Sequence, residues 1–190
     1  STVTDTLLLT VHPLSAGGDI AGSTSVCYGS NSTLLELSGH TGAIVKWQYA
    51  NQLPDKGGDI WQDIANTTDS LRVTDLTQTT IYRAIVKSGN CNEAISDTAT
   101  ITVYPVTAGG VIAGSDTVCS GTNSTELTLS SHVGRIIKWQ WKPAANPTKF
   151  PEQWSDIPNT TSDSYTALNL TASLQYRVVI KSGVCNETYS

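Results

Sequence analysis

A chain of 190 residues has room for two domains of ordinary size, and its net charge of −5 argues against nucleic acid or an anionic membrane as partner, since both require basic patches. Charged residues make up only 14%, while Ser, Thr, Gly and Asn are abundant, which is typical of secreted all-β domains and unusual for a cytosolic enzyme. The sequence contains no stretch of about 18 apolar residues, so no insertion into a membrane is expected.

Short alternating runs rich in Val, Ile, Thr and Tyr, separated by Gly, Asn and Asp, predict strands along the whole chain. In the first half we expect them near residues 24–28, 32–38, 43–50, 59–64, 70–75, 80–88 and 94–104. In the second half we expect them near residues 116–120, 124–130, 135–142, 153–157, 163–168 and 174–182, with a further start near 187. Seven short strands in about 90 residues predict an all-β fold of two tandem immunoglobulin-like β-sandwich domains.

The two halves carry nearly the same sequence. Residues 17–27 (GGDIAGSTSVC) recur as residues 109–119 (GGVIAGSDTVC), a shift of 109 − 17 = 92. The shift grows to 93 after the loop at 50–60 and to 94 after residue 70, so the insertions fall in loops. A period this long indicates separately folded tandem domains rather than a solenoid.

The repeat also predicts the domain boundaries. Residues 5–13 match residues 97–105 with the same shift of 97 − 5 = 92. We therefore expect residues 1–13 to be the last strand of a preceding repeat, 14–105 to be repeat 1, and 106–190 to be repeat 2 without its last strand. On this interpretation the chain is an excerpt from a longer array.

Strand parity identifies the expected core. Val45, Trp47 and Tyr49 share one face of their strand, and the second half places Trp139 in the position of Trp47. A tryptophan on the third strand is the usual centre of an immunoglobulin-like core. Tyrosine corners are expected at Tyr82 and Tyr176.

The four cysteines recur in matching positions, and three connectivities are possible. Cys27 and Cys91 are 91 − 27 = 64 residues apart in repeat 1, and Cys119 and Cys185 are 185 − 119 = 66 apart in repeat 2. The repeat favours one bridge in each domain, Cys27–Cys91 and Cys119–Cys185, each stabilising by about 4 kcal/mol in the chain-entropy model. Such bridges imply an oxidising compartment. A zinc site is disfavoured, because there is no CxxC and no paired histidine.

Catalytic and metal-binding patterns are weak. The sequence has no nucleophile elbow and no HExxH, and His40 and His132 are interpreted as polar residues of matching turns. Asp55 and Asp59 suggest calcium, but repeat 2 has Pro143-Ala144-Ala145-Asn146 in that loop, which weakens a shared metal site and favours a solvated loop. We expect no catalytic, cofactor or metal site, and therefore no enzyme.

Trp61 and Trp154, which correspond, are the best candidates for contact with a ligand. Exposed on a strand, they would stack on sugar rings; packed over the edge of the core, they would be structural. The second interpretation is favoured, and both fit the sequence.

At this point the residues resemble a known family. The order Gly-Gly-x-Ile-Ala-Gly-Ser, Val-Cys, Gly-x-Asn-Ser-Thr, Lys-Trp-Gln, Trp-x-Asp-Ile, Tyr-Arg and Lys-Ser-Gly-x-Cys-Asn resembles the Ig-like repeats of very large surface proteins of Bacteroidetes. These include the mobile adhesins of gliding bacteria, exported by the type IX system. The resemblance implies an extracellular, cell-surface location. It also implies O-glycans at Asp-Ser/Thr motifs, here at Thr6, Ser70, Thr98 and Thr117.

The expected function is that of a structural repeat module of a long, filamentous cell-surface adhesin. As a disulfide-stapled stalk, it would project adhesive regions for surface attachment or gliding motility. The expected partners are neighbouring repeats of the same chain, surface polysaccharide and other adhesin-associated cell-surface proteins. The alternative is a carbohydrate-binding accessory module of a secreted polysaccharide-degrading enzyme, which exposure of Trp61 and Trp154 would favour.

Overall fold

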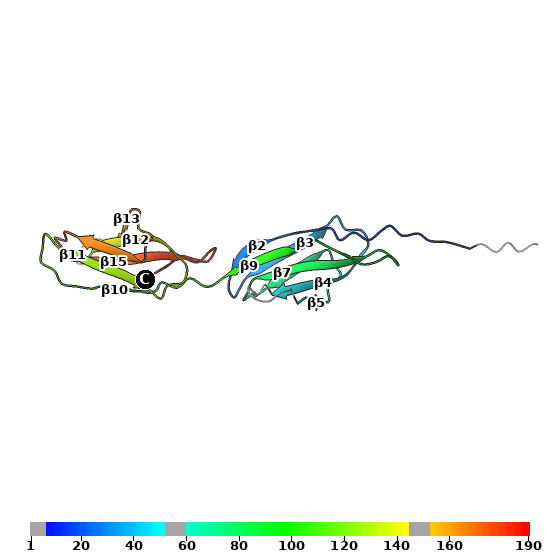
Figure 1. Ribbon diagram of the computed structural model, residues 1–190, viewed down its shortest axis with the longest axis horizontal. Helices are drawn as coiled ribbons and strands as arrows, with labels where there is room; N and C mark the ends of the chain where they lie inside the picture. Colours follow the sequence, from blue (N-terminus) through cyan, green and yellow to red (C-terminus); the bar gives the residue numbers. More distant parts are fainter. Residues whose placement is uncertain (1–6, 52–59, 145–152) are drawn as a thin grey trace, which may run out of the picture. The chain divides into compact units, whose positions relative to one another are not determined.

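The computed structural model describes residues 7–51, 60–144 and 153–190, and every regular element in these ranges is a β-strand (Figure 1). The chain divides into two compact units. One consists mainly of the residues up to Val103, and the other mainly of Tyr104–Ser190. Each unit is a sandwich of two antiparallel sheets, which confirms the predicted fold class.

The first unit has two sheets, a small sheet of three strands and a larger sheet. The small sheet has the order β1-β3-β6, comprising β1 (Asp19–Ala21), β3 (Ser32–Ser38) and β6 (Ser70–Thr74). The larger sheet has the order β2-β9-β7-β4-β5, comprising β2 (Thr24–Cys27), β9 (Ala99–Tyr104), β7 (Thr80–Lys87), β4 (Ala43–Asn51) and β5 (Gln62–Ile64). A short strand, β8 (Ala94–Ile95), also pairs with β7.

The second unit repeats most of this arrangement. Its small sheet has the order β10-β11-β14, comprising β10 (Val111–Ala113), β11 (Ser124–Ser130) and β14 (Ser164–Leu168). Its other sheet has the order β13-β12-β15-β16, comprising β13 (Ser155–Ile157), β12 (Arg135–Pro143), β15 (Leu174–Lys181) and β16 (Thr188–Tyr189). Within the described part of this unit, nothing corresponds to β2 or β9.

Most of the predicted strands are present, and the differences have local causes. The expected strand 94–104 is divided into β8 and β9 at Ser96, whose hydroxyl accepts the N–H of Ala84 and donates to the carbonyl of Asp97. The short strands β1 and β10 were not predicted. The predicted strand at 116–120 is wrong, because these residues form no strand.

Tryptophan forms the centre of each core, as parity predicted. Trp47 and Trp139 are fully buried. The indole N–H of Trp47 donates to the carbonyl of Thr68 at 3.0 Å, and that of Trp139 donates to the carbonyl of Ser162 at 2.9 Å. Each large apolar ring is therefore buried with its one polar group satisfied.

The parity predicted at the start of the third strand is wrong. A β-bulge between Ile44 and Lys46 shifts the register of β4 against β7. Ile44 is consequently buried, while Val45 is 39% exposed. The bulge recurs between Ile136 and Lys138 in β12, so the two repeats share this irregularity. A strict two-residue alternation counted back from Trp47 assumes a regular strand and therefore does not predict the bulge.

Candidate functional site

The cysteines are paired differently from the prediction. The structure contains one disulfide, between Cys27 and Cys185, whose Cα atoms are 5.1 Å apart. Cys91 and Cys119 are free. The predicted bridges Cys27–Cys91 and Cys119–Cys185 are therefore wrong, and the observed bridge joins a cysteine of the first sequence repeat to one of the second.

The strand arrangement explains why Cys27 does not meet Cys91. Cys27 lies at the end of β9, where the N–H of Tyr28 donates to the carbonyl of Tyr104 at 2.8 Å. Because β7 is antiparallel to β9, with Thr80 opposite Ile101, the first residue of β7 lies towards that end. Cys91 follows the last residue of β7, roughly 25 Å away at about 3.3 Å per strand residue. A disulfide requires Cα atoms within about 7 Å, which excludes the pairing within repeat 1.

The surroundings of Cys91 and Cys185 match each other. The Sγ of Cys185 lies 3.3 Å from the carbonyl oxygen of Pro105, and the Sγ of Cys91 lies 3.3 Å from that of Pro13. Each repeat has one early cysteine (Cys27 or Cys119) and one late cysteine (Cys91 or Cys185). This arrangement fits a bridge between two repeats as well as a bridge within one repeat. That ambiguity is why the periodic sequence did not identify the correct pairing.

A polar cluster lies on the larger sheet of the first unit. The carboxylate of Asp63 accepts hydrogen bonds from Lys46 Nζ at 2.8 Å and from Gln48 Nε2 at 2.7 Å. The amide oxygen of Gln48 in turn accepts the Nε–H of Arg83 at 2.8 Å. The guanidinium carbon of Arg83 lies 3.9 Å from the ring centroid of Trp61, a cation–π contact.

The second unit repeats this cluster residue by residue. Asp156 accepts from Lys138 Nζ at 2.8 Å and from Gln140 Nε2 at 2.7 Å, and Arg177 Nε donates to Gln140 at 2.7 Å. Arg177 lies 4.3 Å from the ring centroid of Trp154. The duplication shows that the cluster belongs to the repeat unit itself.

Hydrogen bonds from Gln48 and then Lys46 lower the pKa of Asp63, and those from Gln140 and Lys138 lower the pKa of Asp156. The folded state therefore favours both carboxylates in their charged form. The cluster can fix the side chains of three neighbouring strands. A carboxylate that is ionised at neutral pH and already hydrogen-bonded is poorly suited to act as a general acid.

Trp61 and Trp154 are both half-buried, between the two sequence interpretations. Trp61 directly precedes the edge strand β5, and Trp154 directly precedes the edge strand β13. An arginine covers one face of each ring. Neither side chain belongs to the buried core, and neither is a fully exposed platform for a sugar.

The remaining predicted residues lie apart from these clusters. His40 lies 3.7 Å from Asp69, and His132 lies 3.8 Å from Asp163, in matching loops. Ser70, Thr98 and Thr117 are exposed. Thr6, Asp55 and Asp59 lie outside the described residues.

Within residues 7–51, 60–144 and 153–190, no group of three or more His, Cys, Asp or Glu side chains is placed to hold a metal ion. The described part of the chain also contains no helix that is long and apolar enough to cross a membrane.

The fold and the bridge define a class, that of disulfide-bonded tandem Ig-like β-sandwich modules, which are typical of extracellular structural repeats. The family described as "Domain of unknown function (DUF8696)" matches twice, at residues 16–105 and 108–190. The chain belongs to this family. No curated protein matches the sequence.

Solved structures resemble the chain in fold alone. Murine CEACAM1b is similar with a TM-score of 0.50 and 12% identity, over 90% of this chain and 96% of that one. A chain in the crystal structure of a mouse coronavirus receptor-binding domain complexed with its murine receptor is similar with a TM-score of 0.51 and 13% identity, over 89% of this chain and 97% of that one. At such identities the likeness supports the tandem Ig-like architecture.

Proposed function

We propose that this chain is a structural repeat module of a filamentous cell-surface adhesin, a stalk that projects adhesive regions for surface attachment or gliding motility. The observation that carries the proposal is the Cys27–Cys185 bridge, which links one sequence repeat covalently to the next. The resemblance to the repeats of giant Bacteroidetes adhesins supplies the cell-surface setting. The module acts mechanically, without catalysis.

The bridge directs the path of tension. Because it joins residues 158 positions apart, a pull applied at both ends of the chain passes from Cys27 to Cys185 and bypasses the strands between them. Both cores, including Trp47 and Trp139, lie in the bypassed segment. An oxidised module therefore resists extension through a covalent bond, whatever the stability of its sandwiches.

Single-molecule force spectroscopy on the 190-residue chain, held at its two ends, tests the stalk proposal. In the oxidised protein only residues 1–27 and 185–190 can stretch, about 110 Å at roughly 3.5 Å per residue. After reduction the extension should rise to about 660 Å, with unfolding of the sandwiches. The Cys27→Ser variant is the control and should give the long extension without a reductant. Equal extension of oxidised and reduced protein would refute the mechanical role.

The half-exposure of Trp61 and Trp154 favours a second candidate, a carbohydrate-binding accessory module of a secreted polysaccharide-degrading enzyme. Arg83 and Arg177 already cover one face of these rings, which reduces the surface left for a sugar. A panel of polysaccharides tested against the chain and its Trp61→Ala and Trp154→Ala variants separates the two functions. Saturable binding that is lost in either folded variant would favour the second candidate, and its absence is expected for a stalk.

A further inference from the structure

The first unit contains a pocket between its two sheets, with a volume of about 330 Å³. Leu71 and Val73 of β6, Tyr49 of β4 and Tyr82 of β7 are among the described residues that line it. Because β6 belongs to the small sheet, whereas β4 and β7 belong to the larger sheet, both layers of the sandwich contribute walls. The pocket therefore reaches into the interior of this unit.

The walls of this pocket are apolar inside and polar at the mouth. Leu71, Val73 and Tyr82 are 6%, 9% and 3% exposed, so they form its inner surface. Asp75 and Gln78 also line it and are exposed residues. An apolar interior with a few polar groups at its opening is the usual character of a site for a small ligand.

The second unit carries an aromatic ring at the corresponding place. Tyr165 in β14 holds the register position that Leu71 holds in β6. The ring centroid of Tyr165 lies 5.8 Å from that of Trp139 and 5.7 Å from that of Tyr176. Tyr176 is the counterpart of Tyr82, which lines the pocket of the first unit. The first unit therefore has a pocket where the second unit has a tyrosine ring.

Other differences between the repeats also lie around this pocket. Asn51 and Gln78 line it, and their counterparts in the second repeat are Pro143, at a shift of 143 − 51 = 92, and Ala172, at a shift of 172 − 78 = 94. The amide side chains of Asn and Gln both donate and accept hydrogen bonds, whereas the side chains of Pro and Ala do neither. The unit with the pocket thus has polar groups at its wall that can bond a polar substituent of a ligand.

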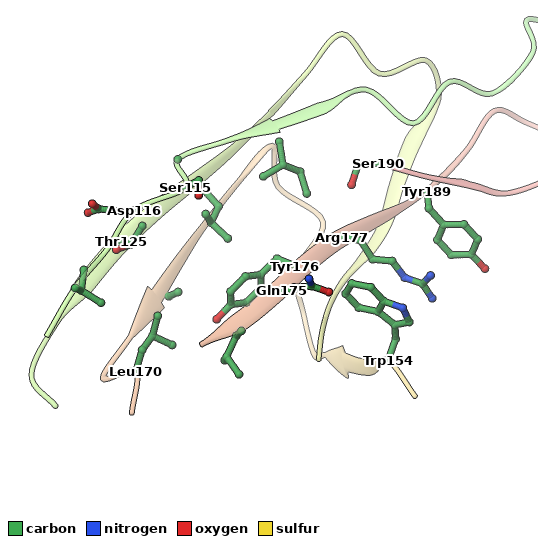
Figure 2. A pocket seen from close by; sticks show the side chains of 16 residues that line it. Ser115, Asp116, Thr125, Trp154, Leu170, Gln175, Tyr176, Arg177, Tyr189 and Ser190 are labelled. Carbon is green, nitrogen blue, oxygen red and sulfur yellow. The ribbon is translucent and has the colours of Figure 1, made fainter. Parts of the chain in front are cut away.

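The larger cavity of the second unit is a different feature. It measures about 570 Å³, and Tyr176, Arg177 and Trp154 are among the described residues on its walls (Figure 2). Tyr176 also packs near Tyr165, but Tyr165 is not among the described residues that line this cavity. The place filled by the ring of Tyr165 is therefore distinct from that cavity, and the pocket of the first unit is the unfilled form of this place.

We propose that the pocket of the first unit binds a small phenolic ligand, whose ring takes the place that the ring of Tyr165 takes in the second unit. The ligand ring packs on Tyr82 in the tilted geometry that aromatic pairs favour, and its hydroxyl bonds the amide of Asn51 or Gln78. A volume of about 330 Å³ is at the small end for ligand pockets, so it holds one substituted ring and excludes a peptide chain. This inference goes beyond the stalk proposal, because a stalk requires no ligand.

Titration of the full chain with p-cresol, followed by amide NMR shifts, tests the proposal. Saturable shifts are expected at Leu71, Val73 and Tyr82, with a Kd of about 1 mM or lower, and the amides of Tyr165 and Tyr176 should not move. No saturable shift up to about 10 mM, or shifts centred on Tyr165, would overturn the proposal. Tighter binding of methyl β-glucoside would overturn the aromatic assignment, and tighter binding of N-acetyltyrosinamide would replace the small molecule with a tyrosine side chain of a partner.

A matched pair of substitutions locates the site. Leu71→Tyr supplies the ring that the second unit has and should weaken binding of p-cresol about tenfold or more, since the new ring fills the pocket. Leu34→Tyr is the control, because Leu34 is 38% exposed opposite Arg72, on the outer face of the same sheet, and it should bind like the parent. Equal binding by the two variants would refute the site. The titration of the parent tests the pocket even where Leu71→Tyr fails to fold, and both tests are independent of the force experiment.

Discussion

The two tryptophans of the first repeat have different roles, and their neighbours account for the difference. Trp47 lies on the inner face of the sheet with no exposed surface, and a backbone carbonyl satisfies its indole N–H. Trp61 lies at an edge, half-buried, with Arg83 over one face. The first ring contributes the burial of a large apolar surface, whereas the second contributes mainly a cation–π contact.

Replacing Trp47 with alanine should therefore lower the free energy of unfolding of the first unit by about 3–5 kcal/mol, since it leaves a large cavity. Replacing Trp61 with alanine removes a partly exposed ring and should cost about 1 kcal/mol. Denaturant unfolding followed by circular dichroism measures both. Similar losses for the two variants would contradict the assignment of Trp47 to the core and Trp61 to the edge.

Asp63 is expected to make the stability of the first unit depend on acid. Its hydrogen bonds with Gln48 and Lys46 lower its pKa below 3.8 in the folded state. A lowered folded pKa gives stability that is present above the unfolded pKa and is lost as the pH falls through the folded pKa. Asp63→Asn should therefore be less stable than the parent at pH 7, and the difference should shrink towards pH 2.

Thermal unfolding between pH 7 and pH 2 measures this effect. Glu36→Gln, a change of equal charge on an exposed residue of β3, is the matched control. A difference between Asp63→Asn and the parent that stays constant across this range would show that the charge of Asp63 is not what stabilises the cluster.

At the scale of the element, β9 determines which other strands form. β2 is on the edge of its sheet, and its neighbour there is β9. The corresponding residues 116–119 have a similar sequence but no such neighbour in the described part of the second unit, and they are not a strand. An edge strand requires a partner for its backbone hydrogen bonds, so its sequence alone does not produce it.

Amide hydrogen exchange should reveal this difference. The amides of Thr24–Cys27 should exchange more slowly than those of residues 116–119, at least tenfold, because only the first set lies in a β-sheet. The two central strands β3 and β11 serve as internal controls and should be protected to a similar degree. Equal protection of the two edge segments would contradict the explanation. Ile101→Asp, which weakens β9, should accelerate exchange in β2 while leaving β11 unchanged.

At the scale of the whole molecule, the bridge combines the two repeats into one covalent loop. Its sequence separation is 158 residues, against 64 for the pairing expected within repeat 1. Loop-closure entropy grows only slowly with length, so the longer loop adds little stability compared with the shorter one. What changes is the connection, since the observed bridge joins a cysteine of one repeat to a cysteine of the other.

A non-reducing peptide map should contain a Cys27–Cys185 peptide and should lack Cys27–Cys91 and Cys119–Cys185 peptides. Cys27→Ser should lower stability by about 5 kcal/mol in the chain-entropy model, whereas Cys91→Ser should leave the bridge and the stability nearly unchanged. Denaturant titration with and without a reductant measures both. A bridge that survives in Cys27→Ser but disappears in Cys91→Ser would contradict this connectivity.

The sequence by itself determined the fold class, the duplication and the centre of each core. These features depend on local patterns: the alternation around Trp47, the turn residues between strands, and a shift of 92–94 residues that matches one half with the other. Burial of an alternating apolar face is dictated by neighbours along the strand, so residue order is sufficient to predict it.

Only the tertiary structure decided the disulfide, the bulges, the break at Ser96 and the absence of a strand at 116–119. Each depends on residues brought together from distant parts of the chain. Cys27 meets Cys185 because β9 ends beside it, and residues 116–119 lack the strand against which β2 pairs. The periodic sequence leaves the pairing open, because one early and one late cysteine in every repeat fit bridges within a repeat and bridges between repeats. The position of β7 between Cys27 and Cys91 resolves it, because that strand separates the two sulfurs by more than a disulfide can span.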